Sequence, residues 1–245
     1  MKVAFLGATK GMGRALARQM AGRGDQLFLL GRDAADLERS ARDLEVRKGK
    51  GVVGTAVCDL EKPEGFAPAL DAAEAGLGGL EAVIVTAGLF APQDKLEQDV
   101  DLARRVVTAD FANTVVFCEH ARKRLLARGG GTLCVFSSVA GERGRKPVAI
   151  YGAAKAGLTR YLEALDHKFR GQGLRTVCVK PGFVKTSMTD GLPAPPFAGE
   201  PEAVARRVLR AIDRGQPVVY VPGAWRWIML VIRCLPRFVM RKIEF

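Results

Sequence analysis

A tyrosine and a lysine four residues apart, Tyr151 and Lys155, are the pair in this sequence whose types and spacing most directly indicate chemistry. On a helix, side chains at this spacing share one face about one turn apart, so the ammonium lies beside the phenol. A free phenol has a pKa of about 10, and a nearby cation favours its ionised form. Together with Ser138 upstream, the pair predicts a proton donor for carbonyl–alcohol redox chemistry.

The elements that must position this pair alternate along the chain. Helical apolar periodicity fills the longer segments at 12–23, 34–48, 101–128, 151–171 and 200–214. Short apolar, β-rich runs occur at 3–6, 26–30, 52–57, 82–86, 132–137, 176–180 and 218–221. The alternation predicts a single α/β domain with a Rossmann-type, doubly wound, seven-stranded parallel sheet. Ligands of such folds bind beyond the carboxyl ends of the strands.

A glycine-rich turn follows the first predicted strand and opens a helix. Its glycines let the backbone turn sharply and approach a pyrophosphate closely. The helix N-terminus adds free N–H groups and a partial positive charge. We therefore expect the turn to bind a dinucleotide cofactor through Gly7, Thr9, Lys10, Gly11, Met12 and Gly13.

The end of the second strand indicates which dinucleotide fits. An acidic residue there would bind the ribose 2′-hydroxyl of NAD, whereas an arginine accommodates the 2′-phosphate of NADP. This sequence has Gly31 and then Arg32, and Lys10 is a second cation that would face the same phosphate. NADP(H) is therefore favoured over NAD(H). The alternative is that Arg32 pairs with Asp33 or Asp36 on the following helix.

The composition is that of a folded, basic protein. The chain has 245 residues, 48% of them hydrophobic, and a net charge of +12. That charge suits nucleic acid, an anionic membrane or a phosphorylated ligand, but no nucleic-acid recognition motif is visible, so we expect no nucleic-acid partner. The five cysteines and two histidines lack metal-ligand spacing, so we expect buried reduced thiols and no metal. The sequence starts directly on a strand rather than an export signal, which favours a cytoplasmic location.

From Val3 to about Pro222 these residues resemble the classical short-chain dehydrogenases/reductases. The glycine turn matches the family's cofactor turn, and Ser138, Tyr151 and Lys155 match its catalytic set. The resemblance implies that Ser138 hydrogen-bonds the substrate oxygen, Tyr151 donates the proton and Lys155 binds the nicotinamide ribose. It also implies a homo-dimer or homo-tetramer. Further cofactor contacts implied by the resemblance are Asp59, Leu60, Ala87, Gly88, Pro181, Gly182, Val184 and Thr186.

Two departures from the family pattern concern the same region. The usual Asn-Asn-Ala-Gly is Val-Thr-Ala-Gly at 85–88, which loses the side-chain amides. Asp110 aligns with an asparagine that in many members serves a water relay to the lysine. A carboxylate there would form an ion pair and change the tyrosine pKa, so Asp110 joins the candidate catalytic residues. Two alternatives stay open: Asn113 takes the asparagine's place, or Asp110 pairs with a nearby arginine.

After a catalytic domain at 1–222, residues 223–245 form an apolar and basic C-terminal tail. Its longest uncharged stretch is shorter than the roughly 20 apolar residues of a spanning helix. Arg226, Arg233, Arg237 and Arg241 are spaced to form one basic stripe on a helix kinked at Pro236. This pattern predicts an amphipathic helix on an anionic membrane surface. The alternative is a tail that packs on its own domain or across a dimer.

Within the family, three segments resemble the reductases that act on a decaprenylphosphoryl 2-keto pentose. The segments are 137–143, 151–158 and the tail with Arg233, Pro236, Arg237, Arg241 and Lys242. This resemblance implies reduction of a small-molecule or lipid-linked ketone by a cytoplasmic enzyme on the inner face of the cell membrane. The alternatives are a 3-ketoacyl-lipid or general carbonyl reductase and a non-catalytic NADP-binding sensor or scaffold. Residues 186–199, with Pro193, Pro195 and Pro196, are expected to form a substrate lid.

Overall fold

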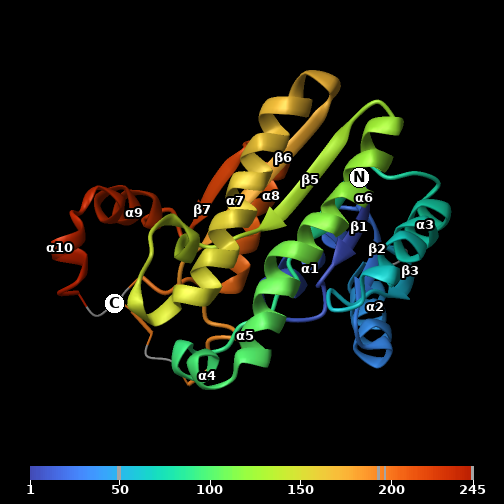
Figure 1. Ribbon diagram of the computed structural model, residues 1–245. Coiled ribbons are helices and arrows are strands. Elements are labelled where there is room, and N and C mark those ends of the chain that lie inside the picture. Colours follow the sequence, from blue (N-terminus) through green and yellow to red (C-terminus); the bar gives the residue numbers. More distant parts are fainter. Residues whose placement is uncertain (49–50, 192–193, 196, 244–245) are drawn as a thin grey trace.

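The sheet of the computed structural model lies between two helical layers (Figure 1). The structure describes residues 1–48, 51–191, 194–195 and 197–243, so Pro193 and Pro196 of the expected lid lie outside the described residues. In that part of the chain the parallel sheet has seven strands in the order β3-β2-β1-β4-β5-β6-β7. The strands are β1 (Lys2–Leu6), β2 (Gln26–Gly31), β3 (Val52–Val57), β4 (Ala82–Val85), β5 (Gly131–Phe136), β6 (Leu174–Pro181) and β7 (Val218–Val221). The predicted α/β class and seven-stranded parallel sheet are confirmed.

Alternate residues of each strand enter opposite cores, because side chains along a strand point to opposite faces. In β1, Val3 and Phe5 pack with α1 (Gly11–Gly22), α2 (Ala34–Lys48) and α8 (Pro201–Arg214). Ala4 and Leu6 pack with α3 (Phe66–Leu77), α6 (Thr114–Ala127) and α7 (Ala149–Phe169) on the other face. The sheet is therefore buried on both sides, which explains why its strands are continuous apolar runs.

The expected helix at 101–128 is interrupted in the structure. It consists of α5 (Val100–Val107), a π-helical turn η2 (Thr108–Asn113) and α6. Thr114 Oγ1 donates a hydrogen bond to the carbonyl of Ala109, five residues earlier, at 2.7 Å, which supports the wider turn. Asp110 lies within this turn and is fully buried. The interruption thus directs a carboxylate into the protein, and such turns are frequent at functional sites.

Several short elements complete the fold. The helices α3 and α4 (Gln93–Gln98) were not predicted from the sequence; along the chain, α3 precedes β4 and α4 follows it. The remaining turns are η1 (Pro63–Gly65), η3 (Val139–Glu142), η4 (Lys146–Val148) and η5 (Arg170–Gln172). Both η3 and η4 lie between β5 and α7, at the carboxyl edge of the sheet.

The C-terminal tail packs on its own domain. It forms two helices, α9 (Trp225–Cys234) and α10 (Arg237–Met240), rather than one kinked helix, because Leu235 before Pro236 is extended. On α9, Met229 and Ile232 are buried against Val139 of η3. The other side of the tail is exposed, including Cys234, so the expectation that all five thiols are buried was wrong for that cysteine. No helix among the described residues is long and apolar enough to cross a membrane.

Candidate active site

Three of the four predicted catalytic side chains come from the loop after β5 and from α7. Ser138 lies two residues after the end of β5 and caps η3, where its Oγ accepts a hydrogen bond from the Ala140 N–H at 3.0 Å. Tyr151 lies in the first turn of α7, and Lys155 lies one turn later with its Nζ 5.5 Å from the centre of the tyrosine ring. Ser137 fixes α7 against β5, since its Oγ donates to the Lys155 carbonyl at 3.0 Å. The structure therefore gathers the residues that the sequence separates.

Asp110 faces Lys155 from the π-helical turn. Its Oδ2 is 3.3 Å from Lys155 Nζ, and the two side chains are 0% and 4% exposed. Its Oδ1 accepts a hydrogen bond from the Leu89 N–H at 2.7 Å, whereas Oδ2 has no hydrogen-bond partner in the described part of the chain. Asn113 instead donates to the Leu60 carbonyl at 2.6 Å. The geometry therefore favours Asp110 over Asn113 at the asparagine position, and among the described residues Asp110 pairs with Lys155 rather than with an arginine.

Burial is the largest influence on the pKa of Tyr151. It raises the pKa of Tyr151 above its ordinary value, and the nearby Asp110 carboxylate raises it further. Lys155 and Ser138 lower it, but not enough to reverse the direction. For Lys155 itself, burial lowers the pKa, yet Asp110 and Tyr151 outweigh burial and raise it. Lys155 therefore acts in the expected direction, but burial and Asp110 together outweigh it, so the expectation of a lowered tyrosine pKa is not met.

The glycine turn forms a close backbone cradle against the end of β4. Gly7 has a positive φ of 96°, which favours glycine, and a Cβ there would lie 2.5 Å from the Ala87 nitrogen. A Cβ on Gly13 would lie 2.1 Å from the Gly7 carbonyl oxygen. Thr86 Oγ1 donates to that same oxygen at 2.9 Å. The threonine that replaces the family's amide thus ties the turn to β4 through a hydroxyl.

A cavity of about 460 Å³ lies at this cradle, where the strand order reverses between β1 and β4. Two contacts connect it to the catalytic side chains. A Cβ on Gly88 would lie 3.4 Å from Lys155 Nζ, and the Phe90 ring lies 5.2 Å from the Tyr151 ring, edge to face. Ser138, Tyr151 and Lys155 therefore lie beside the cavity but are not among its lining residues, so the predicted cofactor contacts of Tyr151 and Lys155 stay predictions. The predicted cofactor residues that line the cavity are Gly7, Thr9, Lys10, Gly11, Met12, Gly13, Arg32, Asp59, Leu60, Ala87, Gly88 and Thr186.

The contacts of the charged side chains at the end of β2 concern the predicted preference for NADP(H). Asp33 Oδ1 accepts a hydrogen bond from the Asp36 N–H at 2.8 Å, so Asp33 caps α2. Asp36 pairs with Arg39 and, at 3.0 Å, with Lys10. Among the described residues no carboxylate lies within ion-pair distance of Arg32, so the alternative pairing of Arg32 with Asp33 or Asp36 is absent there. Lys10 lines the cavity, but it shares its charge with Asp36.

One charged pair at the cavity was not predicted from the sequence. Glu61 lines the cavity, and Arg105 of α5 donates two hydrogen bonds to it, at 2.7 and 3.1 Å. Arg105 holds the pKa of Glu61 below its usual value. No local motif joins these residues, because the chain brings them together only through the packing of α5 beside the β3 loop.

The segment after β6 lies against the tail. Of the residues predicted there, Pro181 ends β6, Val184 is buried and Thr186 reaches the cavity. Gly182 leaves room for the indole of Trp225, because a Cβ on Gly182 would lie 2.1 Å from Trp225 Nε1. Pro181, Gly182 and Val184 do not line the cavity, so their predicted cofactor contacts stay predictions.

A second buried charge cluster fixes the tail to the loop after Ser138. Glu142 of η3 pairs with Lys180 of β6, and these side chains are 4% and 8% exposed. Glu142 Oε2 also accepts a hydrogen bond from Tyr220 at 3.1 Å and lies 3.2 Å from Arg233 Nη1. Arg233 belongs to α9, so the tail contributes to a cluster that begins four residues after Ser138.

Comparison with known proteins agrees with this geometry. A family model described as short chain dehydrogenase matches residues 2–195. The chain belongs to the short-chain dehydrogenase family. An uncharacterized oxidoreductase of Mycobacterium tuberculosis is 33% identical over 241 residues, 98% of this chain and 96% of that protein. The cis-4-hydroxycyclohexanecarboxylate dehydrogenase of Sinomonas cyclohexanicum is 32% identical over 191 residues, 77% of this chain and 75% of its own.

Solved structures of short-chain dehydrogenases share the fold. One from Mycobacterium ulcerans superposes with a TM-score of 0.83 at 22% identity, covering 93% of this chain and 89% of its own. An actinorhodin polyketide ketoreductase superposes with a TM-score of 0.82 at 22% identity, covering 91% and 97%. The family model and the relatives show that the chain is an NAD(P)-dependent oxidoreductase, and the solved structures show that it shares their fold.

Proposed function

We propose that this short-chain dehydrogenase reduces a ketone to a secondary alcohol with NADP(H), and that its substrate is amphipathic or lipid-linked. The observation that supports the reaction is the placement of Ser138, Tyr151 and Lys155 beside a glycine-lined cavity at the carboxyl edge of the sheet. The 32% identical relative from Sinomonas is named as a dehydrogenase of a hydroxycyclohexanecarboxylate, which agrees with alcohol–ketone chemistry.

The residues around the cavity fit the cofactor. At Gly7 and Gly13 there is no room for a side chain, so the backbone can approach a pyrophosphate closely. No acidic residue lies in the first turn of α1. Bound NADPH would supply the hydride that the carbonyl carbon receives. Ser138 and Tyr151 hold the carbonyl oxygen, and the Tyr151 hydroxyl donates its proton to that oxygen as negative charge develops there. Lys155 stabilises the resulting phenolate, and Asp110 holds the ammonium in place.

Arg32 supports NADP(H) over NAD(H). Arg32 lines the cavity, and the carboxylates of Asp33 and Asp36 are engaged elsewhere. We expect Arg32→Gln to weaken NADPH binding about 10- to 100-fold, the range for a lost charge-assisted hydrogen bond, and to leave NADH binding within about twofold. Fluorescence titration with both cofactors measures this. Equal weakening of both cofactors would assign Arg32 to general folding rather than to the 2′-phosphate.

The exposed side of the tail supports an amphipathic substrate. Trp227, Leu230 and Val231 lie on one exposed face of α9 at helical spacing, and Arg226 and Arg233 flank them. An exposed apolar face with basic borders suits the surface of an anionic membrane. We expect Trp227→Ser/Leu230→Ser/Val231→Ser to abolish cosedimentation with phosphatidylglycerol vesicles. The matched control is Val100→Ser/Val107→Ser/Val116→Ser, which changes three exposed valines elsewhere. No cosedimentation of the unaltered protein would refute the membrane proposal.

Turnover tests the reaction directly. Tyr151→Phe removes the proposed proton donor, so we expect NADPH oxidation with a panel of ketones and membrane lipid extracts to fall about 10²- to 10⁴-fold. Tyr161→Phe is the matched control on the same helix, because Tyr161 donates to Glu119 at 2.7 Å and lies outside the site. Unaltered turnover by Tyr151→Phe would show that another group donates the proton. NADPH binding without turnover of any ketone would favour the sensor alternative, and mass analysis of the reduced lipid identifies the substrate.

A further inference from the structure

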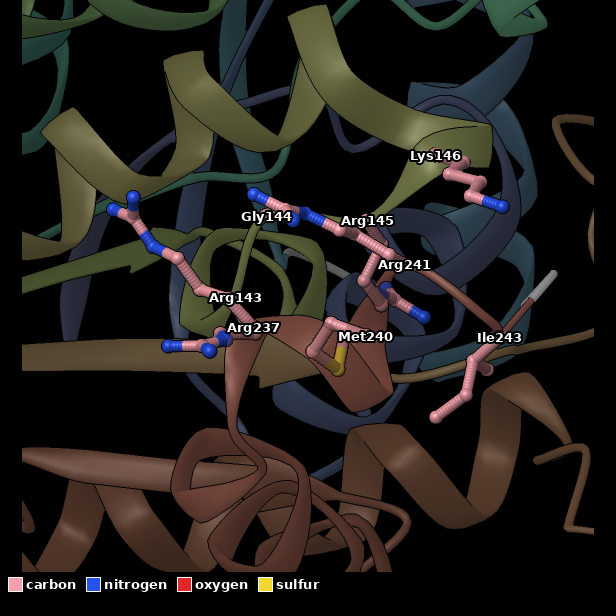
Figure 2. A pocket seen from close by; sticks show the side chains of 8 residues that line it. All are labelled: Arg143, Gly144, Arg145, Lys146, Arg237, Met240, Arg241 and Ile243. Atoms are coloured by element: carbon pink, nitrogen blue, oxygen red, sulfur yellow. The ribbon is translucent and has the colours of Figure 1, made fainter.

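A second pocket lies apart from the cofactor cavity, between the loop that follows η3 and the end of the tail. Its volume is about 460 Å³, and it shares no lining residue with the cofactor cavity. One wall belongs to 143–146, and the other belongs to α10 and the residues after it. Figure 2 shows the lining side chains, which are Arg143, Gly144, Arg145, Lys146, Arg237, Met240, Arg241 and Ile243.

The lining carries an excess of positive charge. Five of the eight described lining residues are arginine or lysine, and none of these eight is acidic. Arg237 and Arg241 are four residues apart, a spacing at which like charges repel. Arg143 directs one nitrogen to the Leu235 carbonyl at 2.8 Å, and this bond fixes the tail to the loop. Because five cationic side chains line one pocket, an anion bound there would relieve their mutual repulsion.

Burial adds to the preference for an anion. It lowers the pKa of the Arg145 guanidinium from its usual value, because a charged group loses hydration when it is buried. A neighbouring negative charge opposes this effect and favours the charged form. Arg145 and Lys146 also interact with other residues, so Arg143, Arg237 and Arg241 are the stronger candidates for ligand contacts.

The chemistry of the lining selects a phosphate ester. Guanidinium groups present paired N–H donors that match the oxygens of phosphate. Met240 and Ile243 add apolar surface, and the volume exceeds that of a phosphate group alone, so there is room for the first carbons of an attached chain. A pocket that combines cations with apolar side chains suits the part of an amphipathic molecule where an anionic group joins a hydrocarbon chain.

The pocket is connected to the active site through the chain. Arg143 lies five residues after Ser138, and Lys146 begins η4, which leads directly into the first turn of α7 and Tyr151. We propose that this pocket binds the phosphate ester group of the amphipathic substrate and so anchors the substrate beside the catalytic tyrosine. The proposal rests on the proposed ketone reduction for the identity of the ligand, but the binding itself can be measured without turnover.

Calorimetry of the full chain saturated with NADPH tests the pocket, because the cofactor's phosphate sites are then filled. The probe is dihexanoyl phosphatidic acid below its micellar concentration. We expect Arg237→Gln/Arg241→Gln to weaken its binding about 100-fold, or tenfold for each lost charge-assisted contact. Arg206→Gln/Arg210→Gln is the matched control, since it removes the same charge from exposed positions of α8. Equal weakening by both double variants, or no binding by the unaltered protein, would overturn the proposal.

A second measurement tests whether the phosphate bound in the pocket belongs to the substrate or to a membrane lipid. The probes are hexadecanoyl dihydroxyacetone phosphate and its phosphate-free counterpart, both of which are ketones. We expect the unaltered enzyme to prefer the phosphorylated ketone and Arg237→Gln/Arg241→Gln to reduce this preference in kcat/KM about 100-fold. If Arg237→Gln/Arg241→Gln keeps the preference for the phosphorylated ketone but no longer cosediments with phosphatidic acid vesicles, the pocket binds a phosphate of the bilayer. The assignment to the substrate phosphate is then wrong. If neither ketone is reduced, the proposed reaction fails for these substrates while the calorimetry still decides whether the pocket binds phosphate.

Discussion

Two buried lysine–carboxylate pairs lie near the carboxyl edge of the sheet, and they differ in how completely their polar atoms are bonded. Glu142 has three partners, Lys180, Tyr220 and Arg233. Asp110 has two partners, the Leu89 N–H at Oδ1 and Lys155 at 3.3 Å, and its Oδ2 has no hydrogen bond among the described residues. A saturated pair of this kind holds elements together, whereas an incompletely bonded pair retains capacity for a ligand or a proton. The Glu142 cluster is therefore structural, whereas the pair of Asp110 and Lys155 is suited to catalysis.

Removing the catalytic lysine should show the largest effect. We expect Lys155→Met to lower kcat about 10²- to 10⁴-fold, because the ammonium no longer stabilises the ionised tyrosine. Burial already raises the pKa of Asp110, so in this variant the carboxyl takes up a proton on folding. A group whose pKa is higher in the folded state stabilises less as pH rises, so the stability loss of the variant should grow with pH. Steady-state kinetics and urea unfolding at two pH values measure both effects, and a pH-independent loss would contradict this account.

Removing the structural carboxylate should chiefly affect stability. Glu142→Gln leaves Lys180 buried without its counter-charge, and we expect the free energy of unfolding to fall by about 3–5 kcal/mol. The control is Glu38→Gln, whose exposed pair with Arg42 at 3.2 Å should contribute less than about 1 kcal/mol. Urea unfolding compares the two variants. A loss no larger than that of the control would show that the two buried pairs do not differ in the way proposed.

Replacing the catalytic carboxylate by the family's amide should change the pH dependence. The Asp110 carboxylate raises the pKa of Tyr151, so Asp110→Asn should lower it. In ketone reduction the phenol must carry its proton, and the rate falls as pH rises through the tyrosine pKa. This fall should therefore move to lower pH in the variant. The pH profile of kcat/KM measures the shift, and a shift to higher pH would mean that Asp110 acts on the tyrosine mainly through Lys155.

The smallest effect is expected at the rim of the structural cluster. Arg233 is 45% exposed, so Arg233→Gln should lower the free energy of unfolding by less than about 1 kcal/mol. Because Arg233 joins α9 to η3, the tail should nevertheless be cut faster in limited proteolysis. Cleavage at the rate of the unaltered protein would assign the tail's attachment to Met229 and Ile232 alone.

Local sequence signals predicted most of the fold. The seven apolar runs correspond to the seven strands because a strand buried on both faces needs no distant residue to be recognised. The helix α3 was missed although its buried residues, Phe66, Ala69, Leu70, Ala73 and Leu77, recur at helical spacing. The π-helical turn at Asp110 was missed because it depends on the hydroxyl of Thr114 and on packing against α7, neither of which changes the helical period.

The site divides in the same way. The glycine turn, Ser138, Tyr151 and Lys155 were predictable because each stands at a fixed place relative to a strand end or a helix face. Ion pairs between residues far apart in the chain were not predictable. Examples are the pair of Arg105 with Glu61 and the pair of Arg233 with Glu142. Burial of Tyr151 is a property of the assembled fold, so the direction of its pKa change required the structure.

The contact between Trp225 and Gly182 gives the protein a natural optical reporter. The indole of Trp225 lies against the segment after β6, whereas Trp227, two residues later, is 65% exposed to water. Indole emission depends on the polarity around the ring, so one tryptophan reports on the joint between tail and catalytic domain and the other on whatever covers the outer face. Trp227 should therefore emit at the longer wavelength and be quenched by iodide. Changes at the joint should appear in the shorter-wavelength emission of Trp225.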